Sequence, residues 1–283
     1  MPDGYRKLDS ERKVFANIVS QSLIGLQMGE QWALHRKLVA PLFSSASIDK
    51  FLPGIHAKCS ELCELWRVQG AGGCEMDVHQ HLSSWSIDIF GRLACAYDFK
   101  ALESERLRRE NIYSKSATII ASEVVRRFIF GAFAKLSRSK MRAFDSAVKV
   151  YTSAADEIIE QAAAGNEVAA GSLAAKLVEL SSREDSPLQR SEVMDEVVGL
   201  LLAGHETSSN TATWALHLLA THPAAQEEVR AEVAGLDLQS ANLHELYACP
   251  LLQATDVEER GVVEGGQGGG GCSSLWLKID LSA

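Results

Sequence analysis

The sequence lacks several features that mark common protein classes. Its six cysteines include no CxxC pair, and a metal site would need further ligands nearby, so reduced intracellular thiols are expected. No apolar run approaches the ~20 residues that a membrane-spanning helix needs. The N-terminal residues show no signal-peptide pattern. Basic residues number 28 against 37 acidic ones, and this net charge of −9 argues against nucleic-acid binding.

Proline is absent between Gly54 and Ser186, and strand-like alternation is scarce throughout the chain. Because proline interrupts helices, this long interval favours helical structure. Glycine is concentrated near the other end, where residues 261–271 hold seven of the 21 glycines. We therefore predict a mainly α domain over residues 1–257, followed by a glycine-rich, disordered tail at 258–283.

Amphipathic patterns bounded by glycine or proline predict a series of separate helices. The patterns cover residues 30–40, 55–66, 76–99, 143–164, 173–180 and 223–233. Residues 100–117 are rich in charged side chains, and we expect them to form a solvated connection.

Residues 119–133 are largely apolar but are interrupted by Arg126 and Arg127, and basic side chains follow at 135–142. An apolar patch with a basic border can lie on a membrane surface. The competing interpretation is a core helix with one solvated face. Peripheral membrane contact through residues 128–142 is therefore one of two alternatives.

One long helix is expected over residues 191–221. Ser186, with proline after it, fits a capped helix start, and Ser191 is an alternative start. Pro223 follows its end. A helix of this length spans about 45 Å and could cross the whole domain.

Polar groups interrupt the middle of this helix, where Gly204, Glu206 and Thr207 follow an apolar run at 197–203. A helical glycine costs ~1 kcal/mol relative to alanine, and an unpaired buried acid costs more. The polar set therefore either faces solvent or serves a site. A mid-helix threonine can bond back to the carbonyl four residues earlier, here Ala203, and Gly204 would let the helix open into a groove. Thr207 and Glu206 could then order water and pass protons.

Familiar catalytic motifs do not occur. His205-Glu206 begins an HExxH pattern, but position 209 is serine, so that zinc site is excluded. Neither a GK[ST] phosphate loop nor a GxSxG nucleophile elbow is present. His79 and His81 would point about 200° apart on a helix, so no metal ligands are predicted.

Trp32 and Arg36 lie four residues apart and share a face of the predicted helix. Arg36 can stack on the Trp32 ring at the surface. Alternatively, the indole N–H and the guanidinium present donors to an anion such as a carboxylate. Spacing alone favours stacking.

The segment from Ala203 to Ser208, Ala-Gly-His-Glu-Thr-Ser, resembles the oxygen-activation motif (AGxET/S) of the cytochrome P-450 haem-thiolate monooxygenases. Residues 29–37 resemble the family's WxxxR helix, and residues 77–99 are similar to its next helical segment. The three matches occur in the family's order. The resemblance covers residues 5–257 and implies the central portion of the cytochrome P-450 fold.

The resemblance also implies haem as the cofactor. Trp32 and Arg36 would bind the haem propionates, which reverses the preference for simple stacking. Ala203 and Gly204 would border the haem and dioxygen.

A monooxygenase reaction is implied as well, in which one oxygen atom enters an organic substrate and the other becomes water. Thr207 and Glu206 would be the catalytic residues, relaying protons for O–O cleavage. The implied partners are an electron-donating reductase and a small hydrophobic organic substrate. Residues 128–142 would fall near the family's membrane-facing substrate entry.

Other parts of the family pattern are missing. Glu258 stands where the ExxR glutamate is expected, but position 261 is glycine. The loop of the axial cysteine is absent, because Gly265 stands seven residues before Cys272, where the family has phenylalanine. The membrane anchor that many members of the family carry at the N-terminus is not found either. Without a thiolate, haem iron loses the electron push toward O–O cleavage, so this chain is expected to be inactive alone. The alternative is a non-catalytic helical scaffold that binds a partner or a hydrophobic ligand.

Overall fold

The computed structural model describes residues 14–71, 73, 75–131, 134, 137–165, 172–183, 188–238 and 240–250. Regular structure in these ranges is helical, and none of their residues forms a strand. In chain order the helices are α2 (Glu30–Val39), the 3-10 helix η1 (Ala40–Phe43), α3 (Ser45–Asp49), α4 (Leu52–Gly70), α5 (Val78–Cys95), α6 (Ala101–Arg106), α7 (Ile112–Phe130), α8 (Arg138–Ala163), α9 (Leu173–Ser181), α10 (Arg190–Thr221), α11 (Pro223–Val233) and α12 (Leu243–Tyr247). The predicted mainly α fold class is confirmed.

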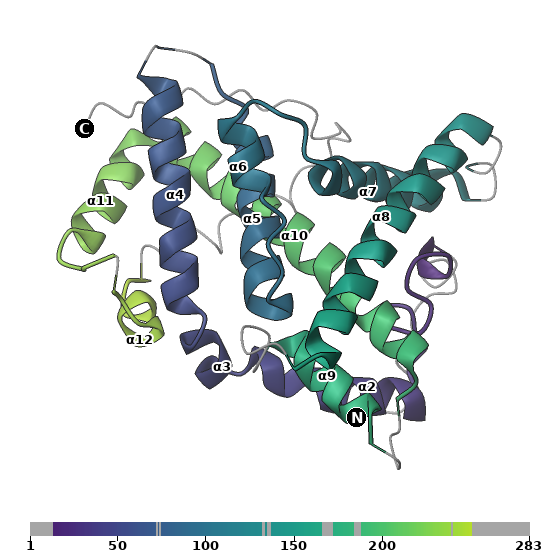
Figure 1. The fold of residues 1–283 in the computed structure, drawn as a ribbon. Coiled ribbons are helices and arrows are strands. Elements are labelled where there is room, and N and C mark those ends of the chain that lie inside the picture. The colour runs from purple at the N-terminus through teal and green to yellow at the C-terminus, as the bar shows by residue number, and fades with distance from the viewer. Residues whose placement is uncertain are drawn as a thin grey trace.

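Helix α10 crosses the molecule and is its central element (Figure 1). It packs most extensively on α5 and also contacts α7, α8, α9 and α11. Its 32 residues span about 48 Å, in agreement with the predicted helix at 191–221. Gln189 caps the start in a capping box with Glu192, whose carboxylate accepts the Gln189 backbone N–H at 2.7 Å. The predicted capped start at Ser186 lies outside the described residues.

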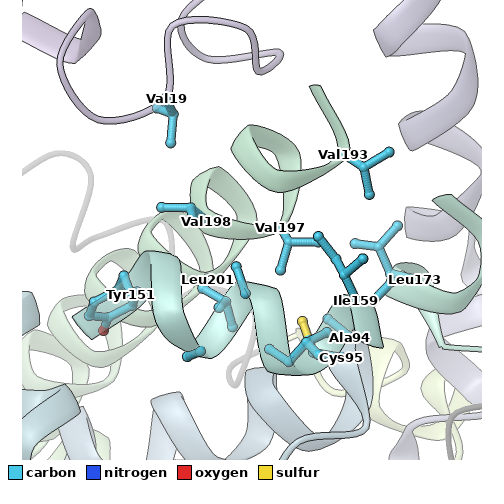
Figure 2. Close-up of a cluster of buried hydrophobic side chains, with 14 of the residues drawn as sticks. Val19, Ala94, Cys95, Tyr151, Ile159, Leu173, Val193, Val197, Val198 and Leu201 are labelled. Carbon is cyan, nitrogen blue, oxygen red and sulfur yellow. The ribbon is translucent and has the colours of Figure 1, made fainter. Parts of the chain in front are cut away.

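The main hydrophobic core lies where α10 meets α5, α8 and α9 (Figure 2). Val193, Val197 and Leu201 project from successive turns of α10 and are at most 1% exposed. They pack with Tyr151 of α8 and Leu173 of α9, which are also buried. Full burial of a side chain of this size contributes about 1.5–3 kcal/mol, so the first half of α10 is firmly held.

A smaller core holds the second half of α10. The buried residues of this second core come from α4, α5 and α6, and Ala212 and Leu216 of α10 lie against them, partly buried. The buried members are Leu62, Leu65, Trp66, Val78, Leu82 and Leu102. Within the described part of the chain, no helix is long and apolar enough to cross a membrane.

Residues 100–117 do not form the solvated connection that the sequence predicted, so that prediction is wrong. Helix α6 begins at Ala101, and α7 begins at Ile112. Ala101 and Leu102 are buried, and the carboxylate of Asp88 on α5 accepts their backbone N–H groups at 2.8 and 3.1 Å. Charged residues dominate the exposed face, whereas two apolar residues and a buried carboxylate fasten the segment to α5.

The predicted glycine-rich tail at 258–283 lies outside the described residues. The division of the chain into a domain over 1–257 and a tail therefore stays a prediction.

Candidate functional site

The polar motif of α10 lies in a continuous stretch of α-helix. Thr207 Oγ1 donates a hydrogen bond of 2.7 Å to the carbonyl oxygen of Ala203. This confirms the back-bond predicted from the sequence. Because the hydroxyl proton is engaged there, the Thr207 oxygen presents only its lone pairs to its surroundings. The predicted opening of the helix at this point is wrong.

An apolar cavity of about 320 Å³ lies against this stretch of α10. Ala203, Glu206 and Thr207 line it from α10, and the N-terminal segment and α7 form its other walls. Its remaining lining residues are Phe15, Ile18, Val19, Ile24, Ala117, Ile120, Ala121, Val124, Gly199, Leu202 and His205. Sites of this size and composition suit small apolar molecules, with a few polar groups to orient them.

Glu206 is half-buried beside this cavity. Burial raises the pKa of its carboxyl, although the charge of His79 and a hydrogen bond from Asn210 act in the opposite direction. His79 of α5 holds that amide in place, with its Nε2 2.9 Å from Asn210 Oδ1. A raised pKa increases the protonated fraction near neutrality, so this carboxyl can donate a proton as well as accept one.

Gly204 faces α5 and does not line the cavity. A Cβ at this position would lie 2.2 Å from two ring carbons of Phe90, which real contacts do not permit. Ser86 Oγ also donates to the Gly204 carbonyl at 3.2 Å. Glycine therefore lets α5 and α10 approach closely, and Phe90 fills the space that the predicted groove would have needed. The role of Gly204 beside a cofactor stays a prediction.

Trp32 and Arg36 share one face of α2. The Arg36 guanidinium lies over the Trp32 ring, with Cζ 5.6 Å from the ring centroid, so the stacking that spacing alone favoured is present. Trp32 is buried, whereas Arg36 is exposed and has no carboxylate partner among the residues that the structure describes. Neither side chain lines the α10 cavity, so the structure does not bring the α2 pair and the α10 motif into one cavity.

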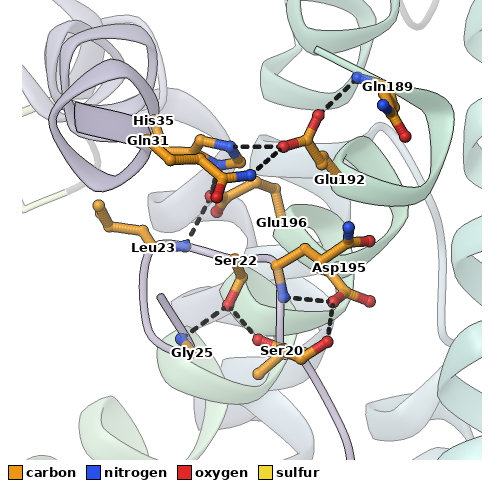
Figure 3. Close-up of polar contacts among 12 residues, drawn as sticks. Ser20, Ser22, Leu23, Gly25, Gln31, His35, Gln189, Glu192, Asp195 and Glu196 are labelled. Carbon is orange, nitrogen blue, oxygen red and sulfur yellow. Dashed lines mark hydrogen bonds and ion pairs between the residues drawn. The ribbon is translucent and has the colours of Figure 1, made fainter. Parts of the chain in front are cut away.

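A buried polar cluster, which the sequence analysis missed, joins α2 to α10 (Figure 3). His35 Nδ1 lies 2.6 Å from Glu196 Oε1, and its Nε2 lies 3.4 Å from Glu192 Oε1. Gln31 Nε2 also donates to Glu192 at 2.6 Å, and the Leu23 backbone N–H donates to Glu196 at 2.6 Å. The available signal was a pair of carboxylates, Glu192 and Glu196, one turn apart near the start of the predicted helix.

Three histidines on α5 and α10 have separate structural partners. His205 is 2% exposed, and its Nε2 lies 2.7 Å from Ser83 Oγ of α5. Burial, assisted by the charge of His79, lowers the pKa of His205 to about 4. His81 Nδ1 accepts the Trp66 indole N–H at 3.0 Å, so His79 and His81 point toward different helices. Among the described residues, no group of three or more His, Cys, Asp or Glu side chains is arranged so that it could hold a metal ion.

Residues 9–255 match the family model described as Cytochrome P450. Among similar curated proteins, 11-oxo-beta-amyrin 30-oxidase of Medicago truncatula is 25% identical, over 82% of this chain and 46% of that protein. Cytochrome P450 monooxygenase 205 of Postia placenta is 24% identical, over 88% of this chain and 50% of that protein. Cytochrome P450 72A15 of Arabidopsis thaliana is 27% identical, over 77% of this chain and 43% of that protein. The chain spans about half the length of the curated relatives that it matches.

Proposed function

Because this chain belongs to the cytochrome P-450 family, we propose that it supplies the oxygen-activating helix of a haem-dependent monooxygenase. Its substrate would be a small hydrophobic organic molecule, and a reductase would provide electrons. The observation that supports this most is the position of Glu206 and Thr207 on the wall of an apolar cavity. A hydrophobic substrate matches such a wall, and two polar groups are then enough to direct its chemistry.

Trp32 and Arg36 are the proposed ligands of the haem propionates. The exposed Arg36 guanidinium has no carboxylate partner in the described part of the chain, and the Trp32 ring beneath it limits its orientations. A guanidinium offers paired N–H donors that match a carboxylate. These donors fit an anionic propionate. When bound, haem would supply the dioxygen chemistry.

Ala203 and Gly204 are proposed to lie beside the haem, with different contributions. Ala203 lines the cavity with a single methyl group, which would let a flat group approach α10. Gly204 would act indirectly, by allowing α10 to sit close to Phe90. An axial thiolate is not assigned to a described cysteine, since none lines this cavity and burial raises the pKa of Cys95 to about 12.

Glu206 and Thr207 are proposed to move protons at the cavity wall. Glu206 has a raised pKa and can release a proton from its carboxyl. Thr207 has its own proton bonded to Ala203, so its oxygen would accept a hydrogen bond from a water molecule. In this arrangement Glu206 would donate the proton, and a water molecule held by the Thr207 oxygen would carry it into the cavity.

Haem titration of the 283-residue chain tests the cofactor proposal. We expect saturable binding of one haem, and at least tenfold weaker binding for Arg36→Gln, because a charge-assisted hydrogen bond contributes about 1.5–3 kcal/mol. Arg230→Gln on α11 is the matched control, since this arginine is also exposed and lies on another helix. Equal affinity of the wild-type and Arg36→Gln chains would contradict the role of Arg36. A stable helical chain without haem binding would favour the non-catalytic scaffold.

We also propose that the C-terminal end of α7 contacts a membrane surface. Val125, Phe128, Ile129 and Phe130 are each about half exposed or more. Large apolar side chains gathered at one helix end indicate an interaction surface. A lipid interface accepts such side chains without a shaped partner.

The basic border of this apolar end comes from α8. Arg138, Lys140 and Arg142 are exposed there. Arg127 does not belong to this border, because it is buried and its Nε donates to Glu123 at 2.9 Å. The charge that could attract anionic lipid is therefore on α8.

Vesicle co-sedimentation tests this membrane contact. Binding is expected to anionic vesicles and to weaken severalfold in the double variant Ile129→Ser, Phe130→Ser. Val68→Ser on α4 is the control, since Val68 is 65% exposed and isolated from the α7 end. Unchanged sedimentation of the double variant would exclude this surface.

A further inference from the structure

His35 lies between two carboxylates at the interface of α2 and α10 (Figure 3). Its side chain is inaccessible to solvent, and those of Glu192 and Glu196 are 7% and 2% exposed. Its Nδ1 is 2.6 Å from Glu196, and its Nε2 is 3.4 Å from Glu192. Each ring nitrogen faces a carboxylate oxygen, and both nitrogens can donate only when the ring is an imidazolium.

The two carboxylates hold this proton on the ring. Burial alone lowers the pKa of His35, but the hydrogen bonds and charges of Glu196 and Glu192 together raise it above 6.5. For the Glu192 carboxyl, burial alone would raise the pKa. The hydrogen bonds from the Gln189 N–H, Gln31 and His35, with the charge of His35, together lower it below 4.5. The contribution of His35 to the free energy of unfolding is lost as pH rises through its raised pKa. The contribution of Glu192 is lost as pH falls through its lowered pKa. Both contributions are therefore complete between pH 4.5 and 6.5.

Glu192 and Glu196 are the only titratable groups of the described residues that act on His35. The N-terminal segment at 14–28 contains no titratable side chain. Asp195 of α10 accepts the Gln21 backbone N–H at 2.7 Å instead. The charged residues of α2 itself, all exposed, are Glu30, Arg36 and Lys37.

The two carboxylates lie one turn apart on α10, so the pair of contacts opposes both rotation and sliding of α2. His35 is next to Arg36 in sequence and three residues after Trp32. Within one helix, the direction of one side chain determines the directions of its neighbours. We infer that the Glu192–His35–Glu196 triad is a clamp that sets the rotation of α2 on α10 and so positions Trp32 and Arg36. The positioning of a propionate ligand rests on the function proposed above.

Nitrogen-15 NMR of the histidine side chains in the full chain tests the clamp without haem. The midpoint of His35 protonation is expected to lie above pH 6.5. The Trp32 indole resonance, assigned with Trp32→Phe, is expected to shift with pH at the midpoint of His35, and this shift is expected to vanish in His35→Asn. A His35 midpoint at or below pH 6.5, or a Trp32 resonance that does not shift when His35 changes protonation, would overturn the inference.

Haem affinity gives the second readout. Glu196→Gln is expected to weaken haem binding at least tenfold with unchanged helical circular dichroism. Asp195→Asn removes a neighbouring carboxylate that does not touch His35, and less than a twofold change is expected. If Glu196→Gln does not fold, Glu192→Gln replaces it, because Glu192 makes the longer contact to His35.

Equal weakening by the clamp variant and by Asp195→Asn would contradict the positioning role. A wild-type chain that binds no haem would contradict the proposed function. In that case the His35 and Trp32 resonances still decide whether the clamp exists.

Discussion

Phe90 of α5 occupies the space that a side chain at Gly204 of α10 would need. Its Cδ2 and Cε2 atoms would each lie 2.2 Å from a Cβ at position 204. Both residues lie where the two most extensively packed helices meet. Gly204 therefore has a packing function in this fold.

Gly204→Ala is expected to destabilise the chain by about 1–3 kcal/mol, because overpacking forces the helices or the Phe90 ring to move. The double variant with Phe90→Ala should recover part of that loss. Chemical denaturation of the four members of this cycle measures the coupling. Gly235→Ala is the control, since a Cβ there meets nothing within 4 Å. Additive losses in the double variant would contradict the proposed contact.

Thr207 and Thr213 make the same back-bond at 2.7 Å, but Thr207 is exposed and Thr213 is buried. We expect Thr207→Ala to change the free energy of unfolding by less than about 0.5 kcal/mol, as is usual for exposed positions. Thr213→Ala should cost about 1–2 kcal/mol, because it leaves an unfilled space. A large loss for Thr207→Ala would show a structural role instead of a site role. In an active enzyme that contains this helix, Thr207→Ala should uncouple oxygen consumption from substrate oxidation.

His205 should make the chain less stable in acid. Its pKa is about 4 in the fold and near 6.5 when unfolded, so the unfolded state takes up the proton first as pH falls. The loss builds up between pH 6.5 and 4 and reaches about 3 kcal/mol. His205→Gln keeps a partner for Ser83 and should remove this part of the pH dependence. The difference between the two unfolding curves isolates it, because other groups contribute equally to both.

Leu201 is fully buried in the main core, and Leu201→Ala is expected to cost about 2–5 kcal/mol. Leu107→Ala is the control, since that side chain is 49% exposed and should change stability by less than about 0.5 kcal/mol. Thermal or chemical denaturation measures both. Similar losses for the two variants would contradict the described core.

The helices near 30–40, 173–180 and 191–221 could be predicted because apolar spacing and breakers are properties of neighbouring residues. The same holds for the Thr207 back-bond and the stacking of Arg36 on its tryptophan, which join positions one turn apart. Residues 100–117 were misinterpreted, because their charge hides the few residues that dock on α5.

Local sequence thus determined the helical class, the extent of α10 and the contacts within single helices, since these depend on interactions over one or two turns. Tertiary structure alone decided that Gly204 faces Phe90 and that His35 lies between Glu192 and Glu196. Those contacts depend on which helices meet and at what rotation, and that is set by the burial of whole apolar faces.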